Sequence, residues 1–336
     1  TASLGILAEG EDILKGQKSF HSLPSFNTYF RQSYYVDVFN KGTTPLKWKA
    51  SVSDNWILLS QKAGETATEN RIEVSIDWAK VPTGEKVHRI DKLVPSRRVY
   101  LKTEEPFSSK DVLVNLIDGD ARGCVFMYRY GDVFFCGCTP ELLVRKQGTS
   151  VESMCLAGTT SCGANEEERT KRANDLLHDD KNRREHEFVV QFMRGVFGRN
   201  CYNVDIPHEP SIKVLRHVQH LCTPASAQVM EGRSLLSLAS QLHPTPALSG
   251  TPVGEAMMTL REAESYNRGF FGGAVGYVDG AGNGEFSVAI RSGVFDGEAG
   301  WLYAGCGIVE GSDAREEFDE IDLKLQTILS AFTAPE

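Results

Sequence analysis

Two acidic helical segments, far apart in the sequence, contain residue types that bind a hard metal ion. In the first segment Lys181 and Glu185 stand four residues apart, ahead of apolar residues at spacings of three and four, so a helix with one buried face is predicted. In the second, Glu317, Glu320 and Lys324 share one helical face. Carboxylates on two helices, each backed by apolar residues, indicate an oxygen-rich site for a divalent cation. Spacing alone favours the simpler interpretation of two solvated faces with intrahelical ion pairs.

The elements that would position these residues follow one another from residue 91 onward. Apolar and alternating runs predict strands, and apolar periods of three to four predict helices. The glycine-rich segment 270–292 has no helix after its glycines, so it predicts a hairpin and not a phosphate-binding loop. The expected strands are 93–101, 124–130, 132–137 and 301–307, and the expected helices are 166–198, 235–242, 253–264 and the C-terminal segment.

The first 88 residues have a different pattern. Short β-type runs over 34–39, 46–52, 56–60 and 71–78 are separated by turn residues. This pattern predicts a small antiparallel, immunoglobulin-like β-sandwich. The sequence as a whole therefore predicts an α+β protein of two domains, an accessory sandwich over 1–88 and a larger domain over 89–336.

Composition narrows the class of protein. The chain has 336 residues, 41% of them hydrophobic, and a formal net charge of -9, which argues against a general nucleic-acid binder. No apolar stretch approaches the length of a membrane span, and the first residues lack the pattern of a signal peptide. The eight cysteines include no Cys-x-x-Cys pair, so reduced thiols are expected and zinc is not. We expect a cytoplasmic protein.

Six short blocks carry a resemblance to a known family. In their order and spacing they closely resemble the chorismate-utilising enzymes, and most closely the isochorismate synthases, over roughly residues 89–332. The resemblance implies the α+β sheets and outer helices of the anthranilate synthase component I type of fold. The blocks are Leu-Ala-Gly-Thr (156–159), Val-Gln-His-Leu (218–221), His-Pro-Thr-Pro-Ala-Leu-Ser-Gly (243–250), Arg-Gly-Phe-Phe-Gly-Gly-Ala-Val-Gly (268–276), Val-Ala-Ile-Arg-Ser (288–292) and Ala-Gly-Cys-Gly-Ile-Val (304–309).

The resemblance implies a catalytic pair and a metal site. Addition of water at C2 of chorismate with loss of the C4 hydroxyl needs a base that takes a proton from the water and an acid that protonates the leaving hydroxyl. Lys92 matches the base of this family and Glu141 matches its acid, although either residue alone would be a surface lysine or a helix-start carboxylate. Glu185 and Glu320 match the Mg²⁺ ligands, and Glu317 matches a supporting carboxylate.

The remaining matches concern chorismate itself. Arg291 matches the arginine that holds the enolpyruvyl carboxylate. Thr159 and His220 match lining positions, but buried structural residues remain an equal interpretation for both. The other substrate-binding residues implied by the resemblance are Ala247, Gly305, Gly307 and Lys324, whereas His243 is expected to be structural.

Single residues discriminate within the family. Aminodeoxychorismate synthases carry Lys where Ala157 stands, and anthranilate synthases typically have Pro-Ile where Cys155 and Leu156 stand. Salicylate synthases tend to have Thr at the position of Ala247 and Tyr at that of Phe271. The resemblance therefore implies an isochorismate synthase without a glutaminase subunit, a monomer or weak homodimer, in siderophore or menaquinone supply. A salicylate or anthranilate synthase is the alternative.

Residues 1–88 resemble the accessory β-sandwich of family 115 xylan α-glucuronidases. The segments that carry this resemblance are 35–42, 54–60 and 71–78. Isochorismate synthases normally carry a further N-terminal portion that this sandwich would replace, so a natural fusion, a chimera and a mis-assembled gene model are all open. Trp48, Trp56 and Trp78 could form a sugar platform, but aromatic residues in alternating strands are usually core. An inactive fusion that serves as a binding module remains the alternative from another class.

Overall fold

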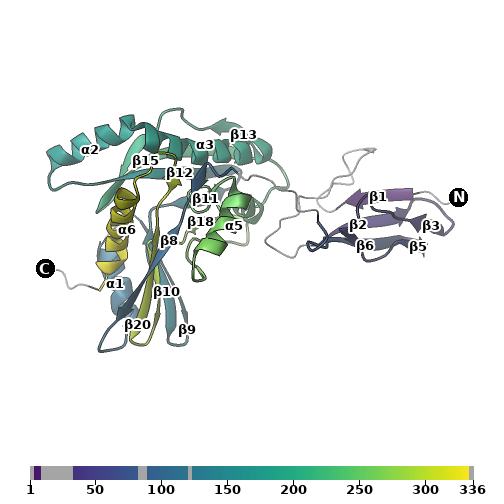
Figure 1. The fold of residues 1–336 in the computed structure, drawn as a ribbon. Helices are drawn as coiled ribbons and strands as arrows, with labels where there is room; N and C mark the ends of the chain where they lie inside the picture. The colour runs from purple at the N-terminus through teal and green to yellow at the C-terminus, as the bar shows by residue number, and fades with distance from the viewer. Residues whose placement is uncertain (1–3, 9–32, 82–88, 120–122, 333–336) are drawn as a thin grey trace. The chain divides into compact units, whose positions relative to one another are not determined.

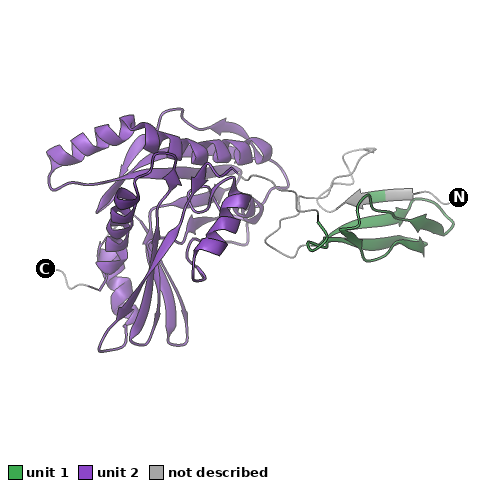
Figure 2. Cartoon of the chain, in the orientation of Figure 1, with its two compact units in different colours: residues 1–88 green, residues 89–336 purple. Residues whose placement is uncertain are grey.

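The computed structural model describes residues 4–8, 33–81, 89–119 and 123–332. The chain divides into two compact units, Thr1–His88 and Arg89–Glu336, which are coloured separately in Figure 2. Each unit is described by itself.

The first unit is entirely antiparallel in its described strands. One sheet has the order β1-β2-β6-β4, and β3 pairs with β5 in a second, two-stranded sheet. Trp48 is 7% exposed and packs with Val38 and Ile72, so the favoured interpretation of Trp48 as a core residue is confirmed and the alternative of a sugar platform does not hold for it. The strands are β1 (Leu4–Ala8), β2 (Ser33–Asn40), β3 (Leu46–Lys49), β4 (Ile57–Leu59), β5 (Ala63–Thr66) and β6 (Glu69–Ile76).

The second unit contains two large antiparallel sheets and one small one (Figure 1). The five-stranded sheet has the order β8-β20-β19-β10-β9, and the seven-stranded sheet includes the path β13-β15-β12-β11-β18-β17 with β14 on β15. The small sheet is β16-β7-β21. The strands are β7 (Lys92–Leu93), β8 (Ser96–Lys102), β9 (Cys124–Tyr130), β10 (Val133–Thr139), β11 (Leu142–Gln147), β12 (Ser150–Ser161), β13 (Cys201–Asp205), β14 (Ser211–Val214), β15 (Val218–Val229), β16 (Gly250–Thr251), β17 (Ala274–Val278), β18 (Gly284–Val288), β19 (Ser292–Asp296), β20 (Ala299–Gly305) and β21 (Ile308–Val309).

Helices cover the large sheets and form two separate cores. Apolar residues of α1 and α6 pack against the five-stranded sheet, and those of α3 and α4 pack against the seven-stranded sheet. Burial of these apolar faces is the main stabilising term for both layers. The helices are α1 (Ser109–Gly119), α2 (Glu166–His178), α3 (Asp180–Asn200), α4 (Leu235–Leu242), α5 (Val253–Ala263) and α6 (Ala314–Leu329).

Helix α3 begins at a clear sequence signal. Asp179 has an extended backbone, and its side chain accepts a hydrogen bond from the backbone N–H of Asn182 at 2.7 Å, which caps an otherwise unpaired donor. The expected single helix over 166–198 is therefore two helices, because Asp179 ends α2 and starts α3. Val189, Met193 and Phe197 on α3 are fully buried, as the apolar spacing predicts.

Other predictions of secondary structure have mixed outcomes. The expected helix 235–242, the hairpin within 270–292 and the C-terminal helix are confirmed. The expected strand 93–101 is broken between β7 and β8 around Pro95, since proline has no N–H to donate to a ladder. Helix α1 was not predicted. In the part of the chain that the structure describes, no helix is both long and apolar enough to cross a membrane.

Candidate active site

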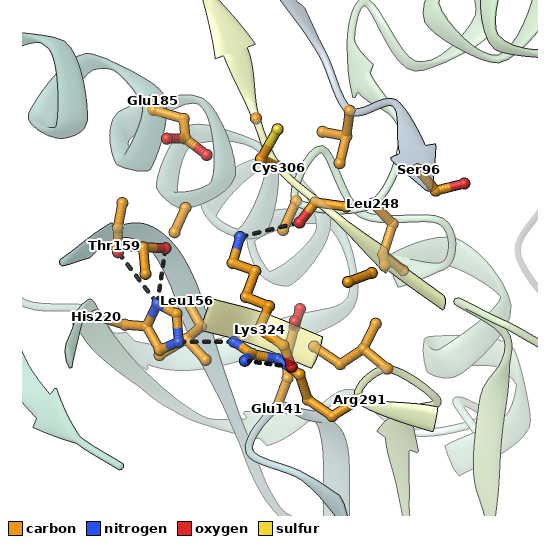
Figure 3. Close-up of a pocket in the computed structure, with 18 of the residues that line it drawn as sticks. Ser96, Glu141, Leu156, Thr159, Glu185, His220, Leu248, Arg291, Cys306 and Lys324 are labelled. Carbon is orange, nitrogen blue, oxygen red and sulfur yellow. Dashed lines mark hydrogen bonds between the residues drawn. The ribbon is translucent and has the colours of Figure 1, made fainter. Parts of the chain in front are cut away.

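Nine of the twelve predicted site residues line one cavity, whose mixture of polar and apolar side chains is of the kind that binds small molecules. Both large sheets, α3 and α6 contribute residues to its wall, and Figure 3 shows Glu141, Glu185, Arg291 and Lys324 among the lining side chains. The discriminating residues Ala157 and Phe271 also line it. Of the predicted site residues, those in the lining are Glu141, Thr159, Glu185, His220, Ala247, Arg291, Gly305, Gly307 and Lys324.

Glu141 lies where the chain passes from one large sheet to the other, between β10 and β11. It does not begin a helix, so the alternative interpretation as a helix-start carboxylate is wrong. Its side chain is buried, and this desolvation raises the pKa of Glu141 to about 7, against the lowering effect of nearby cations. Glu141 is therefore partly protonated at neutral pH and can donate a proton.

Arg291 and His220 form a hydrogen-bonded row with Thr159. A guanidinium Nη2 of Arg291 donates to Nε2 of His220 at 3.1 Å, so Nε2 must be the acceptor and Nδ1 must carry the proton. Nδ1 lies 3.2 Å from the Gly158 carbonyl oxygen and 3.1 Å from Oγ1 of Thr159. The pKa of His220 is held well below its usual value, mainly because the ring is desolvated by burial and secondly because the positive charge of Arg291 lies nearby. His220 is thus a neutral residue that orients Arg291.

The backbone at Arg291 adopts a conformation that non-glycine residues rarely use. Its φ is 53°, and its side chain is buried. The segment that follows β18 turns at this residue into β19, which directs the guanidinium toward the cavity. Such strain is typical of functional sites, where the surrounding structure stabilises it. The position fits a residue that must present a guanidinium to an anion.

Three carboxylates opposite Glu141 are each paired with a lysine. Lys92 Nζ lies 3.1 Å from Glu185 Oε1, and Lys324 Nζ lies 2.5 Å from Glu320 Oε1. Lys181 pairs in the same way with Glu317. Lys92, Glu317 and Glu320 do not line the cavity; Lys92 is 1% exposed and contacts the lining residue Glu185. All three carboxylates act on Lys181, so with their lysines they form a charge-balanced cluster, of which Glu185 and Lys324 line the cavity.

The donor set of this cluster fits a Mg²⁺ ion. Glu317 Oε2 is buried and has no hydrogen-bond partner in the described structure, which leaves an oxygen available. A Cβ at Gly307 would lie 2.1 Å from Glu185 Oε1, so any larger residue there would displace that carboxylate. No three His, Cys, Asp or Glu side chains within the described ranges are grouped closely enough to hold a metal by themselves. A Mg²⁺ ion held here would therefore take one or two of these carboxylates together with water and substrate oxygens.

Sequence reasoning missed Arg268, which also lines the cavity. Its guanidinium forms two hydrogen bonds to Glu264, at 2.8 and 2.5 Å, and donates to the carbonyl oxygens of Leu248 at 2.9 Å and Val94 at 2.7 Å. Glu264 in turn accepts from the backbone N–H and the hydroxyl of Ser96, both at 2.8 Å. This half-buried pair thus links Val94, Ser96 and Leu248, which also line the cavity. The spacing Glu-x-x-x-Arg ahead of a glycine was the available signal.

Sequence comparison identifies the protein family to which this fold and site belong. Residues 61–333 match the family of chorismate binding enzymes, and the chain belongs to this family. The match begins inside the first unit, whereas the expected resemblance begins at residue 89. The proposed likeness of residues 1–88 to a xylan α-glucuronidase sandwich stays a prediction.

Curated relatives point to one branch of the family. The isochorismate synthase MenF of Bacillus subtilis is 37% identical over 278 residues, covering 83% of this chain and 55% of the relative. The isochorismate synthase EntC of Escherichia coli is 36% identical over 245 residues, covering 73% of this chain and 63% of the relative. The chain thus spans between about half and two thirds of the length of these relatives.

Solved structures agree on the fold. The menaquinone-specific isochorismate synthase MenF of Escherichia coli superposes with a TM-score of 0.68 at 18% identity, covering 99% of this chain and 95% of that one. Anthranilate synthase component I of Streptococcus pneumoniae gives a TM-score of 0.62 at 26% identity, over 71% of this chain and 53% of that one. The predicted α+β class is therefore confirmed.

Proposed function

We propose that the chain converts chorismate to isochorismate with the help of Mg²⁺. The observation that carries the proposal is that one cavity is lined both by Glu141, a buried carboxyl with a pKa of about 7, and by Glu185 of α3, a carboxylate ion-paired with Lys92. The names of the relatives supply the substrate class.

The positive charges at the cavity wall fit a substrate with two carboxylates, such as chorismate. Arg291 would bind the enolpyruvyl carboxylate through two parallel N–H donors, because a guanidinium matches the geometry of a carboxylate. Lys324, which donates to the Gly305 carbonyl oxygen at 3.0 Å, adds positive charge beside it. Gly305 and Gly307 leave the backbone close to the bound ring.

Mg²⁺ would be held by Glu185 and Glu320, with Glu317 supporting them. The ion supplies charge neutralisation for the ring carboxylate and fixes its orientation. These three carboxylates come from helices whose apolar faces are buried, so their backbone positions are rigid. A rigid support is what a positioned substrate requires.

Proton transfer is assigned to Glu141 and Lys92. From the uncharged amine form of Lys92, water forms the new bond to C2 and gives its proton to that amine, the ring double bond shifts, and the C4–O bond breaks. Glu141 gives its proton to that leaving oxygen, which departs as water. Glu141 then recovers a proton and Lys92 loses one, so the net reaction is an isomerisation.

The product is expected to be isochorismate, released without loss of pyruvate. Of the residues that distinguish the branches of the family, Leu156, Ala157, Ala247 and Phe271 line the cavity where chorismate would lie, whereas Cys155 does not. Use of water instead of ammonia removes the need for a glutaminase subunit. Supply of a siderophore or of menaquinone is the expected role.

The test is a product analysis with purified protein, chorismate and Mg²⁺. We expect isochorismate to accumulate to an equilibrium with chorismate, without pyruvate. Equimolar pyruvate with salicylate or anthranilate would show a lyase instead, and unchanged chorismate in a folded preparation would refute the proposal.

A further inference from the structure

Lys213 lies outside the lining of the cavity but reaches the segment that carries Glu141. It belongs to β14, the strand that pairs with the outer part of β15. Its ammonium donates to the carbonyl oxygen of Pro140 at 2.7 Å and lies 3.3 Å from Met154 Sδ. Pro140 is the residue directly before Glu141, so this bond fixes the backbone from which the acid projects.

The register of the sheet places Lys213 on the same face as two lining residues. Lys213 stands opposite His220 on β15, and His220 stands opposite Thr159 on β12. Residues directly opposite one another in antiparallel strands point to the same face. Lys213 is therefore the third member of a row whose other two members line the cavity.

We propose that Lys213 is a positioning residue for Glu141, which anchors the Pro140 carbonyl and keeps one positive charge behind the Glu141 carboxyl. The proposal rests on the acid role given to Glu141 in the proposed function. It adds a residue that neither the family match nor the sequence patterns single out.

Lys213 differs from the other charged groups that face Glu141. Lys92 and Lys324 already have carboxylate partners, and Arg291 would gain one when chorismate binds. Lys213 contacts neutral atoms, so its charge stays available to Glu141 in the loaded enzyme. The groups that face Glu141 are the cations Lys92 from β7, Lys213 from β14, Arg291 from the turn into β19 and Lys324 from α6, and the thiols Cys155 from β12 and Cys222 from β15.

The charge of Lys213 has a defined consequence for the acid. Burial raises the pKa of Glu141, and the four cations oppose this effect by favouring its carboxylate. Removal of Lys213 must therefore raise the pKa of Glu141 further. Because a general acid works in its protonated form, the high-pH side of the kcat profile should move to higher pH.

The first experiment compares kcat against pH in wild type, Lys213→Met and Lys213→Gln. Both variants lose the charge, while glutamine retains a donor for the Pro140 carbonyl. In both variants the pH at which kcat falls on the alkaline side (the high-pH limb of the profile) should be higher than in wild type by about half a pH unit or more. The methionine variant should also lose a few-fold in kcat, because it lacks the hydrogen bond to the Pro140 carbonyl. Lys213→Arg, which keeps the charge, should leave the limb near its wild-type position.

Lys146 offers a matched control. It is a half-buried lysine on β11 of the same sheet that likewise donates to a carbonyl oxygen, that of Gly282 at 3.3 Å, but it is not among the cations that act on Glu141. Lys146→Met should leave the limb in place. An unchanged limb in folded Lys213→Gln, or an equal displacement in Lys146→Met, would overturn the proposal.

A second measurement needs no turnover. Infrared titration of the protonated carboxyl, assigned by its loss in Glu141→Gln, should show the midpoint at higher pH in Lys213→Met and Lys213→Gln than in wild type. A shifted midpoint without any conversion of chorismate would refute the proposed function and keep the role of Lys213. Conversion of chorismate with an unshifted midpoint would refute the role of Lys213 alone.

Discussion

Carboxyl groups on the two sides of the cavity lie in opposite electrostatic environments. On the helical side Glu185, Glu317 and Glu320 are each held by a lysine at close range. On the side of the sheets Glu141 is buried with no such partner in direct contact among its described bonds, and desolvation raises its pKa to about 7. Paired carboxylates stay anionic and can receive a cation, whereas a desolvated carboxyl keeps a proton that it can give away. We therefore propose two different roles for the same type of side chain, according to its neighbours.

The largest expected effect is the loss of turnover when the proposed metal site on α3 and α6 is disrupted. Glu320→Gln, or removal of Mg²⁺ with a chelator, should reduce turnover below detection, because the ring carboxylate then loses its counter-charge. Metal binding, measured by calorimetry with Mg²⁺ and chorismate together, should be lost in the same variant.

Glu316 provides the control for this prediction. It lies on the same helix as Glu320 but is exposed, so Glu316→Gln should retain both activity and metal binding. Full activity of the wild type in excess chelator would contradict the metal assignment.

The next largest effect is expected from substitution of Glu141, on the side of the cavity formed by the sheets. Glu141→Gln keeps the shape of the side chain but removes the transferable proton, so kcat should fall by about 10²- to 10⁴-fold while KM changes little. Steady-state kinetics with chorismate measure both constants. A rise in KM with unchanged kcat would show that Glu141 binds the substrate and does not act as the acid.

A smaller effect is expected at the residue that joins the two sides. Arg291→Ala should raise KM by about 10- to 100-fold, since a charge-assisted carboxylate contact contributes roughly 1.5 to 3 kcal/mol. The effect should fall mainly on KM, because the contact is common to ground and transition states. His220→Asn tests the supporting role of His220, and a loss as large as that of Arg291→Ala would show that His220 contacts chorismate itself.

The smallest effect is on stability. The folded pKa of Glu141 is raised from 4.5 to about 7, so the folded state binds more protons than the unfolded state between these values. The Glu141 contribution to stability is therefore present below about pH 4.5 and is lost as pH rises toward 7, by roughly 3 kcal/mol. Glu141→Gln should lack this loss. Urea unfolding of both proteins across this range measures the difference, and parallel curves would contradict the burial of an ionisable carboxyl.

The sequence predicted the helical side better than the side of the sheets. Helical spacing places Glu317 and Glu320 on one face from local rules alone, and the lysine partner of Glu320 lies one turn later. The site of Glu141 depends on a crossing between two sheets that brings together Lys213 and Arg291 from distant strands. No local pattern encodes such a meeting, so only the family resemblance pointed to Glu141.

The same contrast holds for elements outside the site. Helix α4 could be predicted because its apolar period and its Ser234 cap lie within a few residues. The Arg268 and Glu264 pair was missed, although its spacing is local, because its significance depends on the carbonyl oxygens of Val94 and Leu248. In the first unit, Trp48 lies in a strand that could face either way, and pairing decides that it is buried.

The most direct test of the division between a metal side and an acid side is the source of the oxygen at C2. Chorismate, Mg²⁺ and wild-type protein are incubated in water labelled with heavy oxygen, and the product is analysed by mass spectrometry. The arrangement of Lys92 and Glu141 predicts isochorismate with one labelled oxygen, at C2, and no such product from Glu141→Gln on the same time scale. Unlabelled isochorismate, or equal labelling and rate in Glu141→Gln, would contradict it.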